Sequence, residues 1–593
     1  MVKEGKYVVN NFYQGGYSSL KPNSGDAFTG YHLPAGSIGA PTKPDTANQI
    51  QQVNQLINQG IIPIEAGALG PEVFDQIPKQ HFKEIGRMAS ITGTKISIHA
   101  PLIEPSGIDP EGRRPWDNTY RTMAENQLND MVSKVHDIKS KEPIPITIHS
   151  SGLPGTEYSF GKEGKEIGRI IAINRETGKL APAEKEERYT PGQDLTKPTK
   201  INAMEELEML NKSEWNNSLS QVVYYKENAD RILNENKPFL HYLAEKQAKG
   251  EKIEESIIDQ GAMNQLSNAE LYQRDAHKYL DGLFSKAYKY GSEKDKKYLM
   301  EVSDNFKKSM ESNQSLPGYS FALQGLINGM SKVSPEMYVP IEKFALEKSS
   351  ETFANVALKA YDKFKDEAPM ICIENMYPGM AFNSAKGDSE IPGMGDLILA
   401  SRKKFVEKAM GNGMDESEAK KQADRLIGAT LDTGHLNISK KKGFEDKDLK
   451  KEVEEIAKYV KHVHLSDNFG YSDSHLPAGM GNVPFKEILE ELEKKGGQSR
   501  KIAEAAGFAQ HFGTSPYPIL LESLGSPMYS SMQMAPYWNQ SIGLQQGYFS
   551  GYGGMLPQGN YESFGAGFSN LPPELGGQRG GAGGSRMSGK PME

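Results

Sequence analysis

The chain has little of what stabilises secreted or membrane proteins. Cys372 is the single cysteine among 593 residues, so no disulfide can form within the chain. No stretch approaches the ~18 consecutive apolar residues of a membrane span. The first residues, MVKEGKYVVNNFYQGGYSSL, lack the apolar core of a signal peptide. These absences predict a cytoplasmic protein that does not contact a membrane.

The chain also lacks a strong excess of either charge. It has 69 basic and 77 acidic residues, which give a net charge of -8 at neutral pH. This balance provides no global attraction to nucleic acid, although it is compatible with a local basic groove. The length exceeds that of one ordinary core, so we expect either several domains or one large barrel with insertions.

Short apolar segments recur along the chain, and most are followed by a polar or glycine-rich loop and a helical pattern. Continuous apolar runs of this length are typical of strands that are buried on both faces of a parallel sheet. The repeats predict a (β/α)8 barrel, and a doubly wound sheet is the competing topology. The eight expected strands are 30–39, 61–67, 95–101, 144–152, 369–376, 427–435, 462–468 and 518–523.

The regular spacing is broken once, between the fourth and fifth expected strands. Residues 167–192 have the pattern of a β-hairpin around the turn NRETGKL, and about 201–335 are polar and helical. We expect an insertion after the fourth strand, which would act either as a lid or substrate clamp or as a structural or oligomerisation module. The expected division is an N-terminal extension (1–29), two barrel halves (30–160 and 339–527), the insertion (161–338) and a disordered glycine-rich tail (528–593).

Side chains of the types that bind metals stand at the ends of most expected strands. The carboxyl ends of parallel barrel strands meet at one mouth, so these side chains should converge there. Clustered carboxylates repel one another unless a cation compensates them, and mixed imidazole and carboxylate ligands suit zinc or manganese. One such residue alone is usually an ordinary polar group, so the prediction depends on the whole set. The predicted ligands are His99, His149, Glu374, Asp432, His435, His464, Asp473, His475 and Glu522.

Four motifs together resemble the xylose isomerase-like TIM-barrel superfamily, which includes endonuclease IV and many sugar isomerases and epimerases. They are IHAP (98–101), DTGH (432–435), HVHLSDN (462–468) and DSHLPAGMG (473–481). The resemblance covers about residues 30–160 and 340–527, and it is strongest to the endonuclease IV branch. That branch implies a first metal on His99, His149 and Glu374, a second on Glu374, Asp432, His464 and Glu522, and a third on His435, Asp473 and His475.

The endonuclease IV branch implies a hydrolase that uses up to three zinc ions, with manganese as another possibility, to cut damaged DNA at abasic sites. Leu102 stands where this branch usually has a tyrosine that wedges into the DNA. Arg113, Arg114 and Arg121 are candidate phosphate contacts, and a solvated loop is the plainer interpretation of that segment.

The isomerase branch implies instead a sugar or sugar-phosphate isomerase or epimerase with one metal ion. In both branches Glu374 and Glu522 are the candidate catalytic carboxylates. A third hypothesis is a binding or scaffold barrel without catalysis, and the intact ligand set disfavours it.

Overall fold

The computed structural model describes residue 29 and residues 31–524. The gaps within this range are residues 141, 162–163, 190, 193–195, 197, 250–259, 388–389, 496–498, 506–507 and 509–515. The predicted glycine-rich tail, and all but one residue of the predicted N-terminal extension, lie outside the described residues. The chain divides into a barrel unit (1–171, 177–179 and 340–593) and an insertion unit (172–176 and 180–339).

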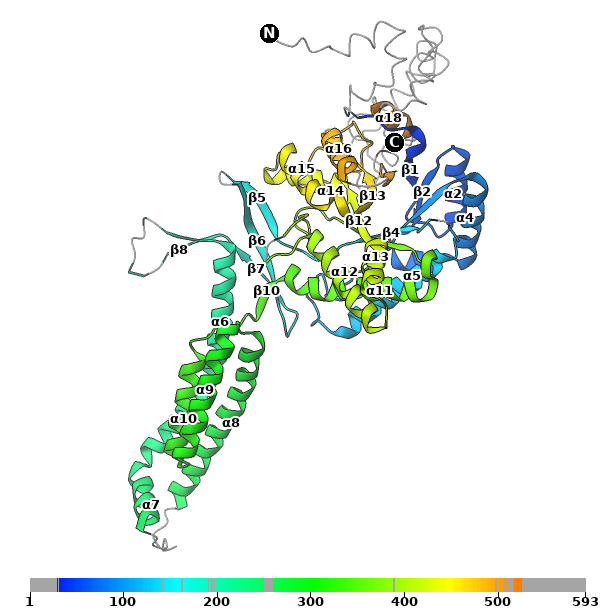
Figure 1. Cartoon of the computed structure of the whole chain (residues 1–593). Coiled ribbons are helices and arrows are strands. Elements are labelled where there is room, and N and C mark those ends of the chain that lie inside the picture. Colours follow the sequence, from blue (N-terminus) through cyan, green and yellow to red (C-terminus); the bar gives the residue numbers. More distant parts are fainter. Residues whose placement is uncertain are drawn as a thin grey trace, which may run out of the picture. The chain divides into compact units, whose positions relative to one another are not determined.

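Eight parallel strands close into a barrel in the order β1-β14-β13-β12-β11-β4-β3-β2 (Figure 1). Every neighbouring pair is parallel, which confirms the predicted (β/α)8 barrel and excludes the open doubly wound sheet. The strands are β1 (Ile38–Pro41), β2 (Pro63–Gly67), β3 (Lys95–His99), β4 (Pro145–His149), β11 (Met370–Glu374), β12 (Ile427–Asp432), β13 (Val460–Leu465) and β14 (Arg500–Ala503).

Helices surround the barrel, and several begin and end at recognisable signals. The side chains of Asp117 and Asp415 accept hydrogen bonds from first-turn amides of α5 and α13, and α4 ends at Gly93 in the left-handed conformation. The helices are α2 (Gln49–Asn58), α3 (Pro71–Gln76), α4 (Lys79–Thr92), α5 (Asn118–His136), α11 (Ile341–Phe364), α12 (Met394–Gly411), α13 (Glu416–Leu426), α14 (Thr433–Asn437), α15 (Asp446–Ile456), α16 (Phe485–Lys495) and α18 (Tyr517–Ser523). Short 3-10 turns are η2 (Ala35–Ser37), η4 (Lys365–Glu367), η5 (Ile438–Lys442) and η6 (Ala457–Tyr459).

Seven expected strands overlap observed ones, but the strand predicted at 518–523 is wrong. That segment forms α18, where Leu520 and Leu524 are both fully buried and lie one helical turn apart. The last barrel strand is β14, which begins with the basic residues Arg500 and Lys501 and therefore contains no long apolar run.

The chain leaves the barrel for the insertion along β6 and returns along β10. Strand β6 pairs with β7 around the predicted turn, which confirms the hairpin, and also with β5 and β10. The strands are β5 (Glu157–Gly161), β6 (Gly164–Asn174), β7 (Leu180–Glu184), β8 (Glu186–Arg188), β9 (Thr199–Ile201) and β10 (Tyr338–Pro340). The helices are α6 (Ala203–Glu235), α7 (Lys237–Lys249), α8 (Gln260–Tyr290), α9 (Glu293–Ser312) and α10 (Leu316–Met330). Helices α6, α8, α9 and α10 share a core that includes Trp215, Leu280 and Leu323. Helix α7 packs against a second cluster, which includes Leu233 and Leu266.

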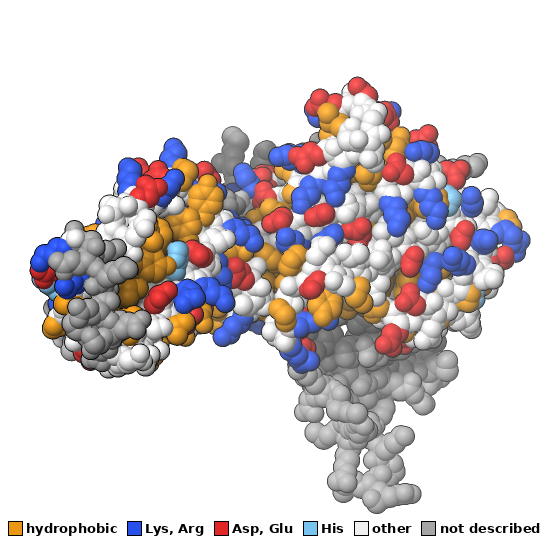
Figure 2. All heavy atoms as spheres, turned by 90° about the horizontal axis from the view of Figure 1, so that it is seen from below, with side chains coloured by type: hydrophobic (Ala, Val, Ile, Leu, Met, Phe, Trp, Pro, Cys, Tyr) orange, Lys and Arg blue, Asp and Glu red, His pale blue; other side chains and the backbone are white. Residues whose placement is uncertain are grey.

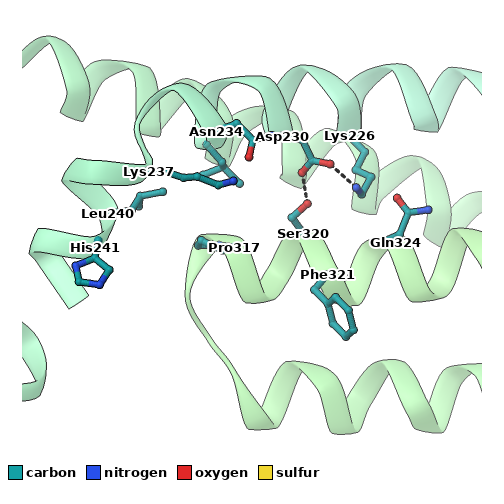
Figure 3. A pocket seen from close by; sticks show the side chains of 11 residues that line it. Lys226, Asp230, Asn234, Lys237, Leu240, His241, Pro317, Ser320, Phe321 and Gln324 are labelled. Atoms are coloured by element: carbon teal, nitrogen blue, oxygen red, sulfur yellow. Dashed lines mark hydrogen bonds and ion pairs between the residues drawn. The ribbon is translucent and has the colours of Figure 1, made fainter. Parts of the chain in front are cut away.

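A groove of about 570 Å³ lies between α6, α7 and α10 of this bundle (Figure 3). Within it, Asp230 accepts hydrogen bonds from Lys226 on the same helix and from Ser320 on α10. The hydrogen bond from Ser320 to Asp230 therefore joins α10 to α6. Figure 2 shows hydrophobic side chains gathered on the bundle, whereas acidic and basic side chains intermingle on the barrel face it draws. Among the helices that the structure describes, none is both long and apolar enough to cross a bilayer.

Arg121 has a structural role that differs from its predicted contact with phosphate. It is buried on α5, and its Nη1 donates to Glu125 Oε2 at 2.7 Å and to the hydroxyl of Thr352 on α11 at 3.4 Å. Its guanidinium is therefore committed to the contact between two barrel helices. The substrate contact of Arg121 stays a prediction, and its burial involves a helix more than 200 residues away in the sequence.

Glu342, in the first turn of α11, is a second buried charge. Its Oε1 accepts the backbone N–H of Thr156 at 2.5 Å, and the residue is 1% exposed. Burial raises the pKa of Glu342 to about 7, and the hydrogen bonds from Thr156 offset this only in part.

We expect Arg121→Ala to destabilise the barrel, because it leaves the Glu125 carboxylate without its cation. Breaking a buried pair costs ~3–5 kcal/mol. Thermal unfolding followed by circular dichroism should show a lower midpoint, whereas Arg113→Ala, at an exposed position, should change it little. Equal effects of the two substitutions would contradict this assignment.

We expect Glu342→Gln to stabilise the protein at pH 8 and to change it little at pH 5. The folded protein holds the Glu342 proton up to a pKa of about 7, above the ordinary value of 4.5, so stability is lost as pH rises through this window. The difference in unfolding midpoint between variant and wild type should therefore grow from pH 5 to pH 8. The exposed Glu347→Gln on the same helix is the control, and a difference independent of pH would argue against the prediction.

Candidate metal centre

Side chains of the types that bind metals lie at the carboxyl ends of six barrel strands, at one mouth. His99, His149, Glu374 and Asp432 are the last residues of β3, β4, β11 and β12, His464 is the penultimate residue of β13, and Glu504 follows β14. Strand register sets Glu374 beside His149 and Asp432 beside His464. The structure brings together eight of the nine predicted ligands in three contiguous groups. These eight are His99, His149, Glu374, Asp432, His435, His464, Asp473 and His475.

The first group is centred on Glu374, which is 1% exposed. Its Oε2 lies 3.5 Å from Nε2 of His99 and 3.2 Å from Nε2 of His149. His99 Nδ1 lies 2.8 Å from the carbonyl oxygen of Ala100. An Nδ1–H that donates to this oxygen leaves the lone pair on Nε2, which is the arrangement that a metal ligand requires.

The second group surrounds His464, whose side chain is fully buried. Its Nδ1 lies 2.8 Å from Glu374 Oε1, 3.5 Å from Glu504 Oε1 and 3.9 Å from Asp432 Oδ2. The other oxygen of Asp432 accepts the backbone N–H of His435 at 2.9 Å and the hydroxyl of Ser466 at 2.8 Å. These bonds orient Asp432 so that Oδ2 faces the imidazole.

The third group joins DTGH to the loop after β13. Asp473 Oδ2 lies 3.2 Å from Nε2 of His435 and 3.0 Å from Nε2 of His475. His435 Nδ1 lies 2.8 Å from the carbonyl oxygen of Asn375. Its ring is therefore oriented by a backbone carbonyl, like the ring of His99. This group is partly exposed, because the Asp473 and His475 side chains are 26% and 30% exposed.

Glu504, and not Glu522, directly follows the last barrel strand. Glu522 lies on α18, whereas Glu504 follows β14 and also brings its Oε2 to 3.6 Å from His475 Nδ1. It therefore lies between the second and third groups. The sequence signal was weak because only Ile502 and Ala503 precede it as apolar residues.

Glu65 and His462 were also missed, and they lie next to His464. Glu65 Oε2 is 2.7 Å from His462 Nε2, and Glu65 Oε1 is 2.9 Å from His464 Nε2. All three side chains are buried. The pattern HVH contains the signal, because side chains two residues apart in a strand point to the same face.

Carboxylates raise the pKa of most histidines at the mouth. Burial alone would lower the pKa of His99, but the nearby carboxylate of Glu374 outweighs it and raises that pKa to about 9. Asp473 likewise overcomes burial and raises the pKa of His475 to about 9. Burial dominates at His149, where it lowers the pKa, and at Glu504, where it raises the pKa. The carboxylates thus favour positive charge, which imidazolium groups or divalent cations can provide.

Several buried oxygen and nitrogen atoms at the mouth lack a hydrogen-bond partner in the protein and could instead bind a metal ion. Within the described part of the chain, Glu374 Oε2, Asp432 Oδ2, Asp473 Oδ1 and His475 Nδ1 make no hydrogen bond. Such atoms are costly to bury without a partner, and nitrogen and carboxylate donors together suit zinc or manganese. Around the mouth, donor atoms lie within 4.8 Å of one another in the sets His99–Glu374–His464, Glu374–Asp432–His435, Asp432–His464–Glu504 and Glu65–His462–His464.

The remaining predicted substrate contacts lie in the segment after β3. Leu102 is 53% exposed. Arg113 pairs with Glu111, and the guanidinium of Arg114 lies 3.8 Å from the ring centroid of Tyr120. Substrate contacts by Leu102, Arg113 and Arg114 stay predictions.

The match to a known protein family lies mainly in the second half of the barrel. The model of the family described as "Xylose isomerase-like TIM barrel" matches residues 324–510. A stretch of 70 residues is 37% identical to an uncharacterized protein of Methanocaldococcus jannaschii. That stretch is 12% of this chain and 22% of the relative, so the chain spans less than a quarter of the relative's length.

Three solved structures are similar at low identity. They are a D-tagatose 3-epimerase-like protein (12% identity, 82% of this chain and 99% of that chain, TM-score 0.33), an L-ribulose 3-epimerase (10%, 86%, 97%, 0.34) and a D-psicose 3-epimerase from Clostridium cellulolyticum H10 (9%, 85%, 98%, 0.34). The family match over residues 324–510 and the closed eight-stranded barrel both agree with a xylose isomerase-like TIM barrel.

Proposed function

We propose that the barrel mouth binds divalent metal ions and that the barrel hydrolyses phosphoesters. The observation that carries this proposal is the third group, His435, Asp473 and His475. A single-metal isomerase does not need these residues, yet Asp473 Oδ2 faces both imidazoles, and Asp473 Oδ1 is a buried oxygen without a hydrogen bond in the described structure. An additional ion on this group is the simplest use for them.

The ligand assignment follows the three groups. His99, His149 and Glu374 would hold one ion, the second group would hold another, and the third group would hold the last. Bound zinc or manganese ions would stabilise charge on a phosphoryl group and lower the pKa of water toward ~7. Glu374 would serve two ions, because one of its oxygens faces His99 and His149 and the other faces His464.

Glu504 is the proposed partner of Glu374 in catalysis, in place of Glu522. Burial raises the pKa of Glu504, which suits a carboxylate that accepts a proton from attacking water. The substrate to test first is DNA with an abasic site. Leu102 and the exposed arginines Arg113 and Arg114 are the proposed contacts, and Arg121 is left out because it is buried.

A sugar or sugar-phosphate isomerase or epimerase is the second candidate. It is favoured because Glu374, Asp432, His464 and Glu504 form a complete ligand group by themselves. One ion could then polarise a carbonyl while the two glutamates move a proton beside it. A scaffold barrel without catalysis is the third candidate, and it requires no bound metal.

Metal content separates these candidates. Protein purified without chelator should contain about three zinc or manganese ions by elemental analysis, and His435→Ala should contain about two, because it removes a ligand of the third group. His136→Ala is the matched control, because His136 stacks on Phe364 outside the mouth. One ion that His435→Ala leaves in place would favour the isomerase, and no ion would favour the scaffold.

The same preparations should then be assayed for nicking of abasic duplex DNA and for epimerisation of free ketohexoses. Nicking that is lost in His435→Ala and retained in His136→Ala would support the hydrolase. Epimerisation that survives His435→Ala would overturn it.

The identity of the last carboxylate ligand can be tested directly. Glu504→Gln removes one negative charge from the second group. We expect metal affinity to fall at least ~10-fold, because changing even the residues that support metal ligands costs this much. Glu522→Gln, on α18, should leave affinity unchanged. Competition with a chromophoric chelator would measure both. A larger loss in Glu522→Gln would return the assignment to that residue.

A further inference from the structure

The loop that carries Asp473 and His475 is held by one buried carboxylate. Asp467, 1% exposed, immediately follows the strand-end segment His464–Ser466. Its Oδ1 accepts the backbone N–H groups of Asn468 at 2.9 Å and Val483 at 3.1 Å. Its Oδ2 accepts those of Gly479 and Gly481, both at 2.8 Å. One side chain therefore binds both the beginning and the end of the loop 468–483.

The backbone of Asp467 adds a second tie to this loop. Its N–H and C=O exchange hydrogen bonds of 2.9 Å with Leu476. Leu476 follows His475, which adopts the left-handed conformation at φ 45°. That conformation is unfavourable for residues other than glycine, so surrounding contacts must maintain it.

The glycines of DSHLPAGMG are required by this arrangement. A Cβ on Gly481 would lie 2.3 Å from both Asp467 Oδ1 and the carbonyl oxygen of Asn468. Gly479 has φ 91°, a conformation that residues with a Cβ rarely adopt. The motif thus permits close approach of the backbone to the Asp467 carboxylate.

We propose that Asp467 is a positioning residue that clamps the loop 468–483 and thereby places Asp473 and His475 as ligands. The importance of those ligands rests on the proposed function, whereas the clamp itself does not. Four amide donors share two carboxylate oxygens, so a neutral side chain of the same shape cannot replace it. An asparagine would offer one acceptor oxygen and would point an NH2 group at amide donors.

Asp467→Asn in the full chain tests the clamp by two measurements. Hydrogen–deuterium exchange of the metal-free protein should show amides of the loop 468–483 exchanging ~10-fold faster or more, with barrel strands unchanged. Elemental analysis should show the loss of one ion, with the others retained. A purely structural role would lower stability without this selective loss.

Asp448→Asn is the matched control, because Asp448 is also a buried carboxylate that accepts a backbone N–H, from Glu445 at 3.0 Å, at the start of α15. It should change neither readout. Gly481→Ala is a second variant, which forces the loop away from Asp467 and should reproduce both effects if Asp467→Asn fails to fold.

Unchanged loop exchange in a folded Asp467→Asn would overturn the clamp whatever the metal content. Faster exchange in a protein whose wild type binds no third ion would support the clamp and count against the proposed function. Loss of every ion together would contradict the selective placement of Asp473 and His475.

Discussion

Repulsion among buried carboxylates is the constraint on which the rest of the barrel mouth depends. Glu374, Asp432 and Glu504 all face the single imidazole of His464, and Glu65 approaches the same ring from its other nitrogen. Buried like charges interact strongly because little water screens them. The strand ends therefore require positive charge, and the raised pKa of His99 and that of His475 are consequences of this requirement.

The barrel meets this constraint through backbone and amide groups that orient the carboxylates. Asn375, the first residue after β11, accepts the N–H of Asp432 at 2.7 Å and donates to its carbonyl oxygen at 3.0 Å. The carbonyl oxygen of Asn375 also lies 2.8 Å from His435 Nδ1. Asn375 thus contacts one member each of the second and third groups, Asp432 and His435, which lie three residues apart in DTGH.

Sequence patterns could predict this site where a strand is apolar on both faces and ends in a polar side chain. β3, β4, β11 and β12 fit that description, and their last residues lie at the mouth as predicted, whereas metal binding by these residues stays a prediction. The search for apolar runs failed at β14, because that strand begins with the basic residues Arg500 and Lys501. Glu504, which follows it, was therefore missed. The burial of Arg121 against α11 could not be predicted either, because it depends on packing between distant parts of the chain. Local patterns identify elements and their ends, whereas partnership across the fold decides which polar side chains are buried.

The two candidate reactions differ mainly in whether ligands from a loop supplement those at the strand ends. Residues at or directly after β11, β12, β13 and β14 provide a complete ligand group for one ion, which would suffice for an isomerase. Asp473 and His475 lie instead on a loop, so the third group forms only if that loop is held against the barrel. In a TIM barrel, loops at the carboxyl ends of strands diversify chemistry on a common core. On the proposed function, the third group therefore needs the loop 468–483 in the conformation seen here, in which four of its backbone amides donate to the buried carboxylate of Asp467.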